Sequence, residues 1–242
     1  MEVDSKQQWQ DAFHAYKALI RDPRHDSEYL RRTGLVPHMV DLIGDVRCAK
    51  VLDAGCGTGW LFDHITPAVG YECDLVPPAG HAARQIHAQC QDIRGLTYDD
   101  DSFDVVVSSL VLMWIDELDS AFQEAFRVTR PGGRLIVGLM HPYFHTNGHA
   151  LHDGSFLIDR PLSAPTRREV SISGLVGPLT YHARPLLDYY NAAVRARWHL
   201  TDFRDHFIDL DRYRAASAAG WPVHRRSDKV PLFTFFVGHK VP

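Results

Sequence analysis

Residues 51–60, VLDAGCGTGW, combine a carboxylate with three closely spaced glycines. Asp53 comes first, and the glycines that follow it are Gly55, Gly57 and Gly59. Glycine lets a backbone approach a ligand closely and adopt positive φ without steric cost. The next segment, WLFDHI, is expected to be helical, and the start of a helix offers free N–H groups. The pattern predicts a loop that holds a nucleotide-like ligand.

Two details of this loop discriminate between nucleotide cofactors. The dinucleotide fingerprint is G-x-G-x-x-G, whereas here the third glycine comes one residue early and Trp60 takes the expected place. A carboxylate just before the first glycine is also unfavourable beside a pyrophosphate. It is favourable beside a cation, and S-adenosylmethionine carries a sulfonium and an ammonium group but no phosphate. Asp53 therefore favours S-adenosylmethionine over a nicotinamide dinucleotide, directly or through the loop and water.

Two further carboxylates follow the next predicted strands. The strand AVGYECDL ends in Asp74, where a carboxylate can accept hydrogen bonds from both ribose hydroxyls, and the weaker strand HAQCQDI ends near Asp92, where a carboxylate can accept from the adenine amine. A single aspartate after a strand is usually a turn or helix-capping residue. Three of them at successive strand ends form a consistent site, because ligands of doubly wound sheets bind beyond the carboxyl ends of the strands.

The elements that must position these residues alternate between strands and helices from about residue 50 to 140, which predicts a parallel α/β sheet with helices on both faces. Two helices are expected before it, over 5–21 and 27–44. Within it, residues 79–87 are expected to be helical. After an irregular segment over 141–184, helices are expected near 185–198 and in DLDRYRAASAAG. WPVHRR and PLFTFFVGHK are expected to close the sheet as an antiparallel pair.

The chain is interpreted as a single domain of 242 residues with three parts. Residues 1–45 form a helical N-terminal lid, 46–140 the cofactor-binding core, and 141–242 an insertion that shapes the acceptor pocket, followed by closing strands.

Five segments, in order, resemble the sequence blocks of the class I S-adenosylmethionine-dependent methyltransferases: VLDAGCGTG, ECDL, QDI, FDVVVSSLVLMWI and RVTRPGGRLIVG. The resemblance is greatest to the small-molecule branch similar to the ubiquinone/menaquinone-type enzymes. It implies a Rossmann-like, doubly wound, seven-stranded sheet whose last strand is antiparallel, with S-adenosylmethionine as cofactor and S-adenosylhomocysteine as product. Glu72 departs from the pattern, because relatives often have glycine there, so both Glu72 and Asp74 are candidates for the ribose, with Asp74 preferred.

The same resemblance implies roles for nine residues. The methionine end would be held by Asp53, Gly55, Gly57 and Gly59, the ribose by Asp74, and the adenine by Asp92 and Ile93. Ser109 would line the region near the sulfonium, and Leu75 would also contact the cofactor.

The acceptor pocket is expected beyond strands four and five and under the N-terminal helices. Two histidines are candidate general bases, with a turn or packing role as the alternative: His141 and His182. Candidate substrate contacts, each equally explicable as core packing, are Tyr16, Met113, Trp114, Tyr143 and Phe144. The N/D-P-P-Y-like motif of nucleobase amine methyltransferases and the HDW block of plant-type phenol methyltransferases are both missing after strand four.

Four histidines lie close together at 141, 145, 149 and 152, but Pro142 and Gly148 prevent one helix from presenting them on a face, so no metal site is predicted. The formal charge of −4 gives no sign of a nucleic-acid partner. The absence of a signal peptide and of a membrane-spanning run favours a cytoplasmic protein. The four cysteines lack a CxxC pair and are expected to be buried free thiols.

The sequence thus predicts a cytoplasmic methyltransferase, monomeric or homodimeric, that forms an O-, N- or C-methyl product from a small-molecule acceptor, as in natural-product or secondary metabolism. The alternative is a cofactor-binding protein of the same fold that serves as a cyclase or scaffold. A nicotinamide oxidoreductase is disfavoured by the glycine spacing and Asp53.

Overall fold

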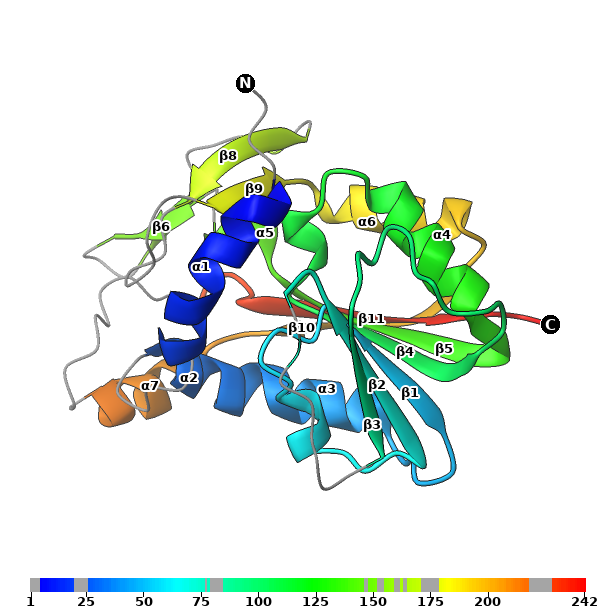
Figure 1. The fold of residues 1–242 in the computed structure, drawn as a ribbon. Coiled ribbons are helices and arrows are strands. Elements are labelled where there is room, and N and C mark those ends of the chain that lie inside the picture. The colour runs from blue at the N-terminus through cyan, green and yellow to red at the C-terminus, as the bar shows by residue number, and fades with distance from the viewer. Residues whose placement is uncertain are drawn as a thin grey trace.

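A seven-stranded sheet runs through the centre of the computed structural model (Figure 1), which describes residues 5–19, 26–76, 78, 85–145, 148–151, 155–158, 162, 165–170, 179–217 and 228–242. In order across the sheet, the strands are β10 (His199–His206), β11 (Phe233–His239), β5 (Thr129–Met140), β4 (Phe103–Ser109), β1 (Lys50–Ala54), β2 (Val69–Asp74) and β3 (Ile86–Cys90). The last strand, β11, is antiparallel to both of its neighbours, whereas β1 to β5 are mutually parallel. The predicted α/β fold class is confirmed.

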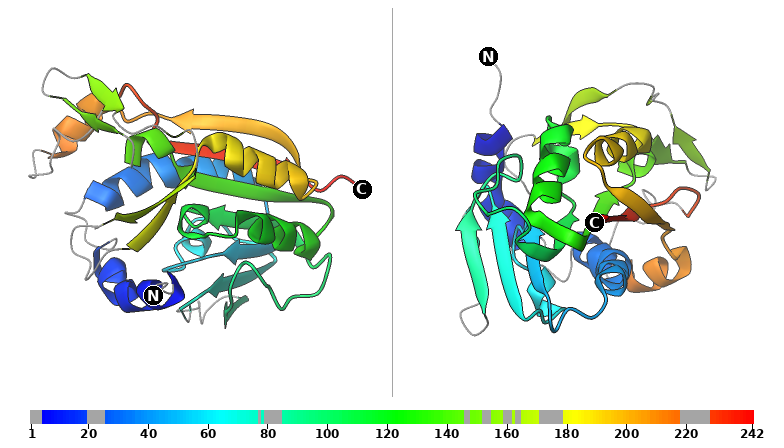
Figure 2. Two further views of the ribbon diagram at one scale, coloured as in Figure 1. Left: turned by 90° about the horizontal axis from the view of Figure 1, so that it is seen from above. Right: turned by 90° about the vertical axis from the view of Figure 1, so that its right-hand side faces the viewer.

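Helices cover both faces of the sheet (Figure 2). Within the described residues, the α-helices are α1 (Ser5–Leu19), α2 (Asp26–Leu30), α3 (Val36–Ile43), α4 (Leu118–Val128), α5 (Pro142–His145), α6 (Leu186–Arg195) and α7 (Leu210–Ser217). On one face, α4 and α6 pack on Leu52, Val106 and Phe236. On the other face, α3 packs on Val51 and Phe235, which are adjacent in sequence to Leu52 and Phe236. This alternation follows from the two-residue period of a strand, which sends consecutive apolar side chains to opposite faces.

Several local predictions were wrong. The segment expected to be helical after the glycine loop is a short 3₁₀ helix, Leu61–Asp63. Residues 86 and 87 begin β3, while 79–84 lie outside the described residues. The neighbours of β11 are β5 and β10, so β10 takes the place given to WPVHRR, which also lies outside the described residues. All four cysteines are free, but Cys48 and Cys90 are exposed rather than buried.

The segment between β5 and α6 adds two small antiparallel sheets at the end of the molecule where α1 lies. One pairs β6 (Gly148–Ala150) with β7 (Phe156–Ile158), and the other pairs β8 (Thr166–Val170) with β9 (Leu179–Ala183). Strand β9 packs beside α1 and beside the 3₁₀ turn Leu112–Trp114 that follows β4. The insertion therefore forms a wall at the carboxyl ends of the parallel strands.

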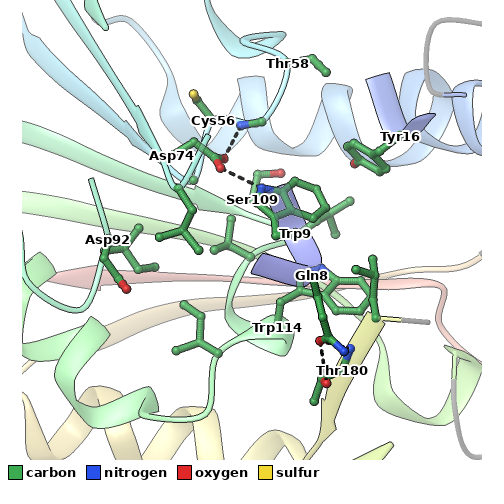
Figure 3. A pocket seen from close by; sticks show the side chains of 18 of the residues that line it. Gln8, Trp9, Tyr16, Cys56, Thr58, Asp74, Asp92, Ser109, Trp114 and Thr180 are labelled. Carbon is green, nitrogen blue, oxygen red and sulfur yellow. Dashed lines mark hydrogen bonds between the residues drawn. The ribbon is translucent and has the colours of Figure 1, made fainter. Parts of the chain in front are cut away.

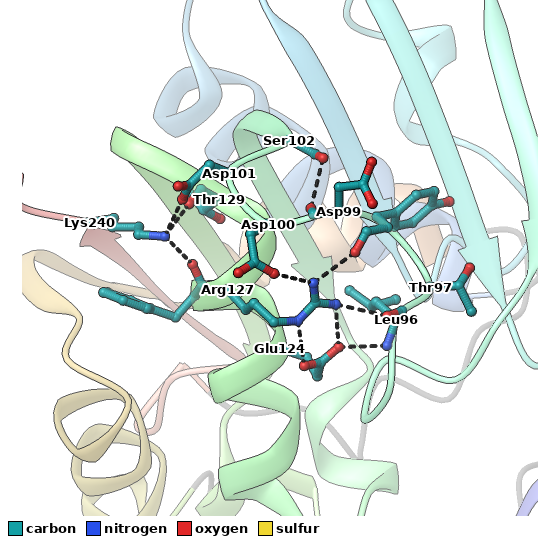
Figure 4. Close-up of polar contacts among 12 residues, drawn as sticks. Leu96, Thr97, Asp99, Asp100, Asp101, Ser102, Glu124, Arg127, Thr129 and Lys240 are labelled. Carbon is teal, nitrogen blue, oxygen red and sulfur yellow. Dashed lines mark hydrogen bonds and ion pairs between the residues drawn. The ribbon is translucent and has the colours of Figure 1, made fainter.

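A cationic side chain fixes the loop between β3 and β4 to helix α4 (Figure 4). The Arg127 guanidinium donates to both carboxylate oxygens of Glu124 and to the carbonyl oxygens of Leu96 and Tyr98, each at 2.8 Å. Glu124 in turn accepts the Leu96 backbone N–H at 2.8 Å. Charged groups with this many hydrogen bonds hold a loop more firmly than a single surface ion pair does. The loop that carries Asp92 is thus anchored by a helix on the outside of the sheet.

A histidine pair joins α3 to the end of β10. His38 Nε2 and His206 Nδ1 lie 3.0 Å apart, and His38 stacks on Phe235. Burial and the neighbouring His38 lower the pKa of His206 to about 4, while burial and Arg204 lower the pKa of His38. Because both pKa values lie below the usual value of a histidine, the two rings are neutral in the folded protein at pH 7, and one ring donates its N–H to the other.

Lowering the pH from 7 to 5 is expected to destabilise the unsubstituted protein more than a His206→Asn variant. The unfolded chain takes up a proton near pH 6.5, whereas the folded state resists it down to about pH 4. The stability contributed by neutral His206 is therefore complete above pH 6.5 and is lost as the pH falls, by about 1–2 kcal/mol at pH 5. Urea unfolding at both pH values measures the difference. A His14→Asn variant, altered at an exposed histidine, is the control, and parallel losses in all three proteins would contradict the prediction.

Candidate cofactor and acceptor site

A cavity opens at the carboxyl ends of β1, β2 and β4, between these strands, α1 and β9 (Figure 3). Its walls combine the glycine loop, the ends of three strands, the lid helix and the insertion. The lining residues are Gln8, Trp9, Tyr16, Arg31, Leu35, Gly55, Cys56, Gly57, Thr58, Trp60, Asp74, Leu75, Asp92, Ile93, Arg94, Ser109, Leu110, Val111, Trp114, Ile115, Asp116, Leu179 and Thr180. One cavity therefore brings together the predicted cofactor loop and the predicted acceptor wall.

The glycine loop turns over the end of β2, where the backbone N–H groups of Gly55 and Cys56 donate to the Cys73 carbonyl oxygen at 2.8 and 3.0 Å. Gly55 has φ of +84°, in the region that glycine favours. A Cβ atom on it would lie 2.3 Å from Val111 Cγ2. Gly55 is thus required both by its backbone conformation and by the close approach of the segment after β4.

Asp74 is held at the end of β2 by donors on both of its oxygens. Gly57 N donates to Oδ2 at 2.8 Å, while Trp9 Nε1 and Val76 N donate to Oδ1 at 2.9 and 3.3 Å. The side chain is 5% exposed, and burial raises its pKa although these hydrogen bonds act in the opposite direction. Asp74 lines the cavity and Glu72 does not, which favours Asp74 over Glu72 as the residue that would bind the ribose.

Asp53 and Glu72 are register partners on β1 and β2 and are both buried. Burial, followed by the nearby carboxylates of Glu72 and Asp74, raises the pKa of Asp53 well above its usual range. Asp53 Oδ2 has no hydrogen-bond partner within the described part of the chain. Asp53 does not line the cavity. It can therefore influence a bound cation only indirectly, through the glycine loop and water, and not by direct contact.

The loop after β3 supplies a polar corner of the cavity. Arg94 Nη2 donates to Asp92 Oδ2 at 2.7 Å, and Arg94 Nη1 donates to Asp116 Oδ1 at 2.7 Å. Asp92, Ile93 and Arg94 all line the cavity. The Asp92 carboxylate is thus already paired with a cation, and an adenine amine would share it with Arg94.

Strand β4 ends in an unusual turn beside the glycine loop. The Ser109 hydroxyl is buried, with 8% of the residue exposed, and it has no hydrogen-bond partner among the residues that the structure describes. The next residue, Leu110, has φ of +58°, which is rare without a glycine. Such outliers cluster at ligand sites. The turn points Val111 at Gly55 and leaves a polar hydroxyl at the cavity floor.

Arg31 was missed by the sequence-based reasoning. It lies in a π-helical turn, Arg31–Leu35, between α2 and α3. Its Nε and Nη2 donate to Glu28 Oε2 at 2.9 and 2.7 Å, and its guanidinium carbon is 5.7 Å from the centre of the Trp60 ring. Nη1 is buried without a hydrogen-bond partner in the described chain. No pattern in RRTGL separates Arg31 from Arg32, because the π turn that points it inward has no sequence signature.

The predicted acceptor residues are only partly brought together. Tyr16 and Trp114 line the cavity. Met113 does not, because it packs in the core with Tyr181. Tyr143 is 40% exposed and lies outside the lining. The side chain of Phe144 lies outside the described residues.

Neither candidate general base lines the cavity. His141 follows β5, is buried, and has its pKa lowered by burial. His182 follows the cavity-lining Thr180 by two residues on β9, so both point to one face of that strand. Burial and the adjacent Arg184 lower the pKa of His182 to about 4. A base with so low a pKa accepts protons weakly at pH 7, and the placement of both histidines argues against base catalysis by either one.

Within the described ranges, the structure holds no cluster of three or more His, Cys, Asp or Glu side chains suited to a metal ion. His152, one of the four closely spaced histidines, lies outside those ranges. Among the same residues, no helix has both the length and the apolar character needed to cross a bilayer.

Comparison with known proteins finds similarity to methyltransferases, the family that the sequence resembles. Residues 52–137 match the family described as a methyltransferase domain. A malonyl-(acyl-carrier protein) O-methyltransferase from Erwinia billingiae is 40% identical over 97 residues, which are 38% of this chain and 39% of that protein. The chain thus spans about two fifths of the length of this curated relative.

Two solved structures share the fold over most of the chain. An S-adenosylmethionine-dependent methyltransferase from Mesorhizobium loti has a TM-score of 0.64 at 21% identity and covers 84% of this chain and 95% of its own. The cyclase SpnF has a TM-score of 0.62 at 18% identity and covers 99% and 97%. The matched methyltransferase domain over residues 52–137, the glycine loop with Asp74 and the antiparallel last strand together support a class I S-adenosylmethionine-dependent methyltransferase domain in this chain, with S-adenosylmethionine as its cofactor.

Proposed function

We propose that this protein transfers the methyl group of S-adenosylmethionine to a carboxylate oxygen of a small acyl acceptor, free or attached to a carrier. The observation that carries the proposal is the character of the titratable groups in the cavity. Burial raises the pKa of the Cys56 thiol and of the Tyr16 phenol, so both stay protonated at pH 7. The carboxylates of Asp74, Asp92 and Asp116 all accept hydrogen bonds from neighbouring donors.

An acceptor in this cavity therefore has to arrive as a nucleophile, because no lining side chain of the described chain is poised to remove its proton. A carboxylic acid with a pKa near 4 is ionised at pH 7, whereas a phenol or alcohol is not. The relative from Erwinia billingiae is named a malonyl-(acyl-carrier protein) O-methyltransferase, and the oxygen nucleophile of a malonyl group at pH 7 is its free carboxylate. Both lines of support favour O-methylation over N- or C-methylation.

The residues present fit the cofactor. The cradle around Gly55 is so tight that a Cβ atom would meet Val111, and two buried polar atoms of the lining, Arg31 Nη1 and Ser109 Oγ, have no hydrogen-bond partner among the described residues. Arg31 would hold the methionine carboxylate, since it lies beside Trp60 at the end of the glycine loop. Asp74 would hold the ribose. When bound, S-adenosylmethionine supplies a methyl group on a positively charged sulfur.

The protein's own part in the reaction is positioning and exclusion of water. Trp114, Leu179 and Ile115 make the acceptor side of the cavity largely apolar. Transfer of a methyl cation to a carboxylate removes one positive and one negative charge, and a low-dielectric wall favours such neutralisation relative to water. The phenolic O–H of Tyr16 can donate to an acceptor oxygen and fix its direction.

Turnover with S-adenosylmethionine is expected for malonyl-coenzyme A or malonate, to give a product 14 mass units heavier that alkali hydrolyses as a methyl ester. The rate should stay constant between pH 6 and 9, since nothing has to be deprotonated in that range. His141→Gln and His182→Gln should retain turnover within about threefold, because neither histidine lines the cavity.

Liquid chromatography with mass spectrometry over a panel of carboxylates, phenols and amines makes the measurement. A rate that rises about tenfold per pH unit, or turnover of phenols alone, would contradict a carboxylate acceptor. Binding of S-adenosylhomocysteine without turnover of any acceptor would favour the cyclase or scaffold alternative.

A further inference from the structure

Three consecutive residues of the lid helix α1 contact different parts of the site (Figure 3). Gln8 Oε1 accepts hydrogen bonds from the Thr180 hydroxyl at 2.8 Å and from the Thr180 backbone N–H at 3.2 Å. Trp9 Nε1 donates to Asp74 Oδ1 at 2.9 Å. Gln10 Nε2 donates to the Leu75 carbonyl oxygen at 3.2 Å. A single turn of α1 therefore connects the end of β2 with the wall formed by β9.

The Asp74 carboxylate has little accepting capacity left. A carboxylate offers about four lone-pair sites. Asp74 Oδ1 accepts from the Val76 backbone N–H and the Trp9 indole, and Oδ2 accepts from the Gly57 backbone N–H, so fewer sites remain than a pair of ribose hydroxyl groups needs. The backbone donors lie in the glycine loop and just after the end of β2, two segments that the sheet holds in place. Trp9 alone among these donors belongs to a separate element, so it is the donor that can leave without disturbing the sheet.

A ribose diol needs acceptor sites on the same carboxylate, because each of its hydroxyl groups donates one hydrogen bond. We propose that the Trp9 indole and the cofactor ribose exchange at Asp74, so that α1 is a latch that must release before the cofactor is bound. The inference rests on the proposed function in one respect, the assignment of Asp74 to the ribose. The latch is a further property, because it makes Trp9, a residue of the lid, compete with the cofactor for Asp74.

The packing of α1 suits a latch. Trp9 packs against two rings of its own helix, edge-on to Phe13 and tilted to Tyr16, with ring centres 5.8 and 5.1 Å apart. The indole ring therefore keeps these neighbours when its N–H releases Asp74. A 15-residue helix is marginally stable in water without tertiary contacts. The position of α1 therefore depends on contacts such as those of Trp9 and Gln8.

The Gln8 contact gives the exchange a second effect. Since Gln8 and Trp9 are neighbours, a shift of α1 that frees Asp74 also strains or breaks the hydrogen bonds to Thr180. Thr180 lines the acceptor side of the cavity. Cofactor binding would thereby loosen the wall on the acceptor side of the cavity. Helix α1, rather than the sheet, would couple the cofactor subsite to the acceptor subsite.

The test compares the unsubstituted protein with Trp9→Phe, which keeps an aromatic ring and removes the N–H donor. The apparent affinity equals the intrinsic affinity multiplied by the fraction of molecules in which the latch is open. Loss of one hydrogen bond to a charged group should therefore tighten S-adenosylhomocysteine binding by about three- to tenfold and speed its association. Calorimetry gives the dissociation constant and stopped-flow fluorescence gives the rate. Gln7→Ala, at an exposed position on the same helix, is the matched control and should bind like the unsubstituted protein.

Equal or weaker binding by Trp9→Phe, with binding intact in the unsubstituted protein, would overturn the latch and leave the proposed function untouched. Absence of binding in all proteins would overturn both. A second measurement needs no stable Trp9→Phe protein. In the unsubstituted protein labelled with ¹⁵N-tryptophan, the Trp9 indole proton should lose its downfield shift when S-adenosylhomocysteine is added, and an indole spectrum that does not change on saturation would likewise overturn the exchange.

Discussion

Asp74→Asn is expected to weaken S-adenosylhomocysteine binding by roughly 100-fold or more, because two charge-assisted hydrogen bonds to the ribose would be lost. The asparagine amide can accept at only one atom and carries two donors on the other. At this position its NH₂ group would face either Gly57 N or Trp9 Nε1, which are themselves donors. The substitution therefore removes the charge and also disturbs the lid. Calorimetric titration measures the change.

Asp45→Asn is the control for this substitution. Asp45 is an exposed aspartate that pairs with Arg47 outside the cavity, so the same chemical change is made without touching the site. Its binding constant should match that of the unsubstituted protein. If Asp74→Asn folds normally and binds within about threefold of the unsubstituted protein, the ribose assignment is wrong.

Gly55→Ala is expected to destabilise the fold by about 2–5 kcal/mol, the sum of the cost of a left-handed conformation and that of overpacking. The new methyl group would lie 2.3 Å from Val111 Cγ2, and the backbone would keep a φ of +84°. Any relaxation has to move either the glycine loop or the turn after β4, and both line the cavity. Cofactor affinity should therefore fall together with the free energy of unfolding, which urea denaturation reports.

Gly132→Ala separates the two causes. Gly132 has φ of +78°, yet a Cβ atom there would meet nothing within 4 Å. This variant should lose only the conformational part, about 1–2 kcal/mol, and keep its cofactor affinity. Adding Val111→Ala to Gly55→Ala should restore part of the loss, as a double-mutant cycle would show. Equal effects of the two glycine variants would mean that the collision with Val111 does not matter.

The part of the cavity proposed to bind the cofactor could be located from the sequence because each of its segments is local. Gly55 directly follows β1 and Asp74 is the last residue of β2, and parallel strands bring their carboxyl ends to one edge of the sheet whatever the rest of the chain does. The apolar strands that carry them are distinctive as well: FDVVVSS is buried almost throughout. The same reasoning gave the antiparallel last strand, although it gave that strand the wrong neighbour.

The remaining parts depend on contacts between distant segments. Strand β10 reads HLTDFRDH and alternates between exposed and half-buried residues, as an edge strand does, so it lacks the apolar run that marks an inner strand. Trp9 and Asp74 are 65 positions apart, and Gln8 and Thr180 are 172 apart. An aromatic stripe such as that of α1 predicts that the helix packs on something, but it does not specify the partner.

The hydrogen bonds of Arg127 have a consequence for how cofactor affinity can vary among descendants of this protein. Arg127 lies on the outer helix α4, yet it holds the carbonyl groups of the loop that carries Asp92. A substitution there would change how rigidly the loop proposed to hold the adenine is positioned, while leaving each side chain of that loop unchanged. Substitutions at the protein's surface can therefore change the strength of cofactor binding during evolution without altering the residues that determine which cofactor binds.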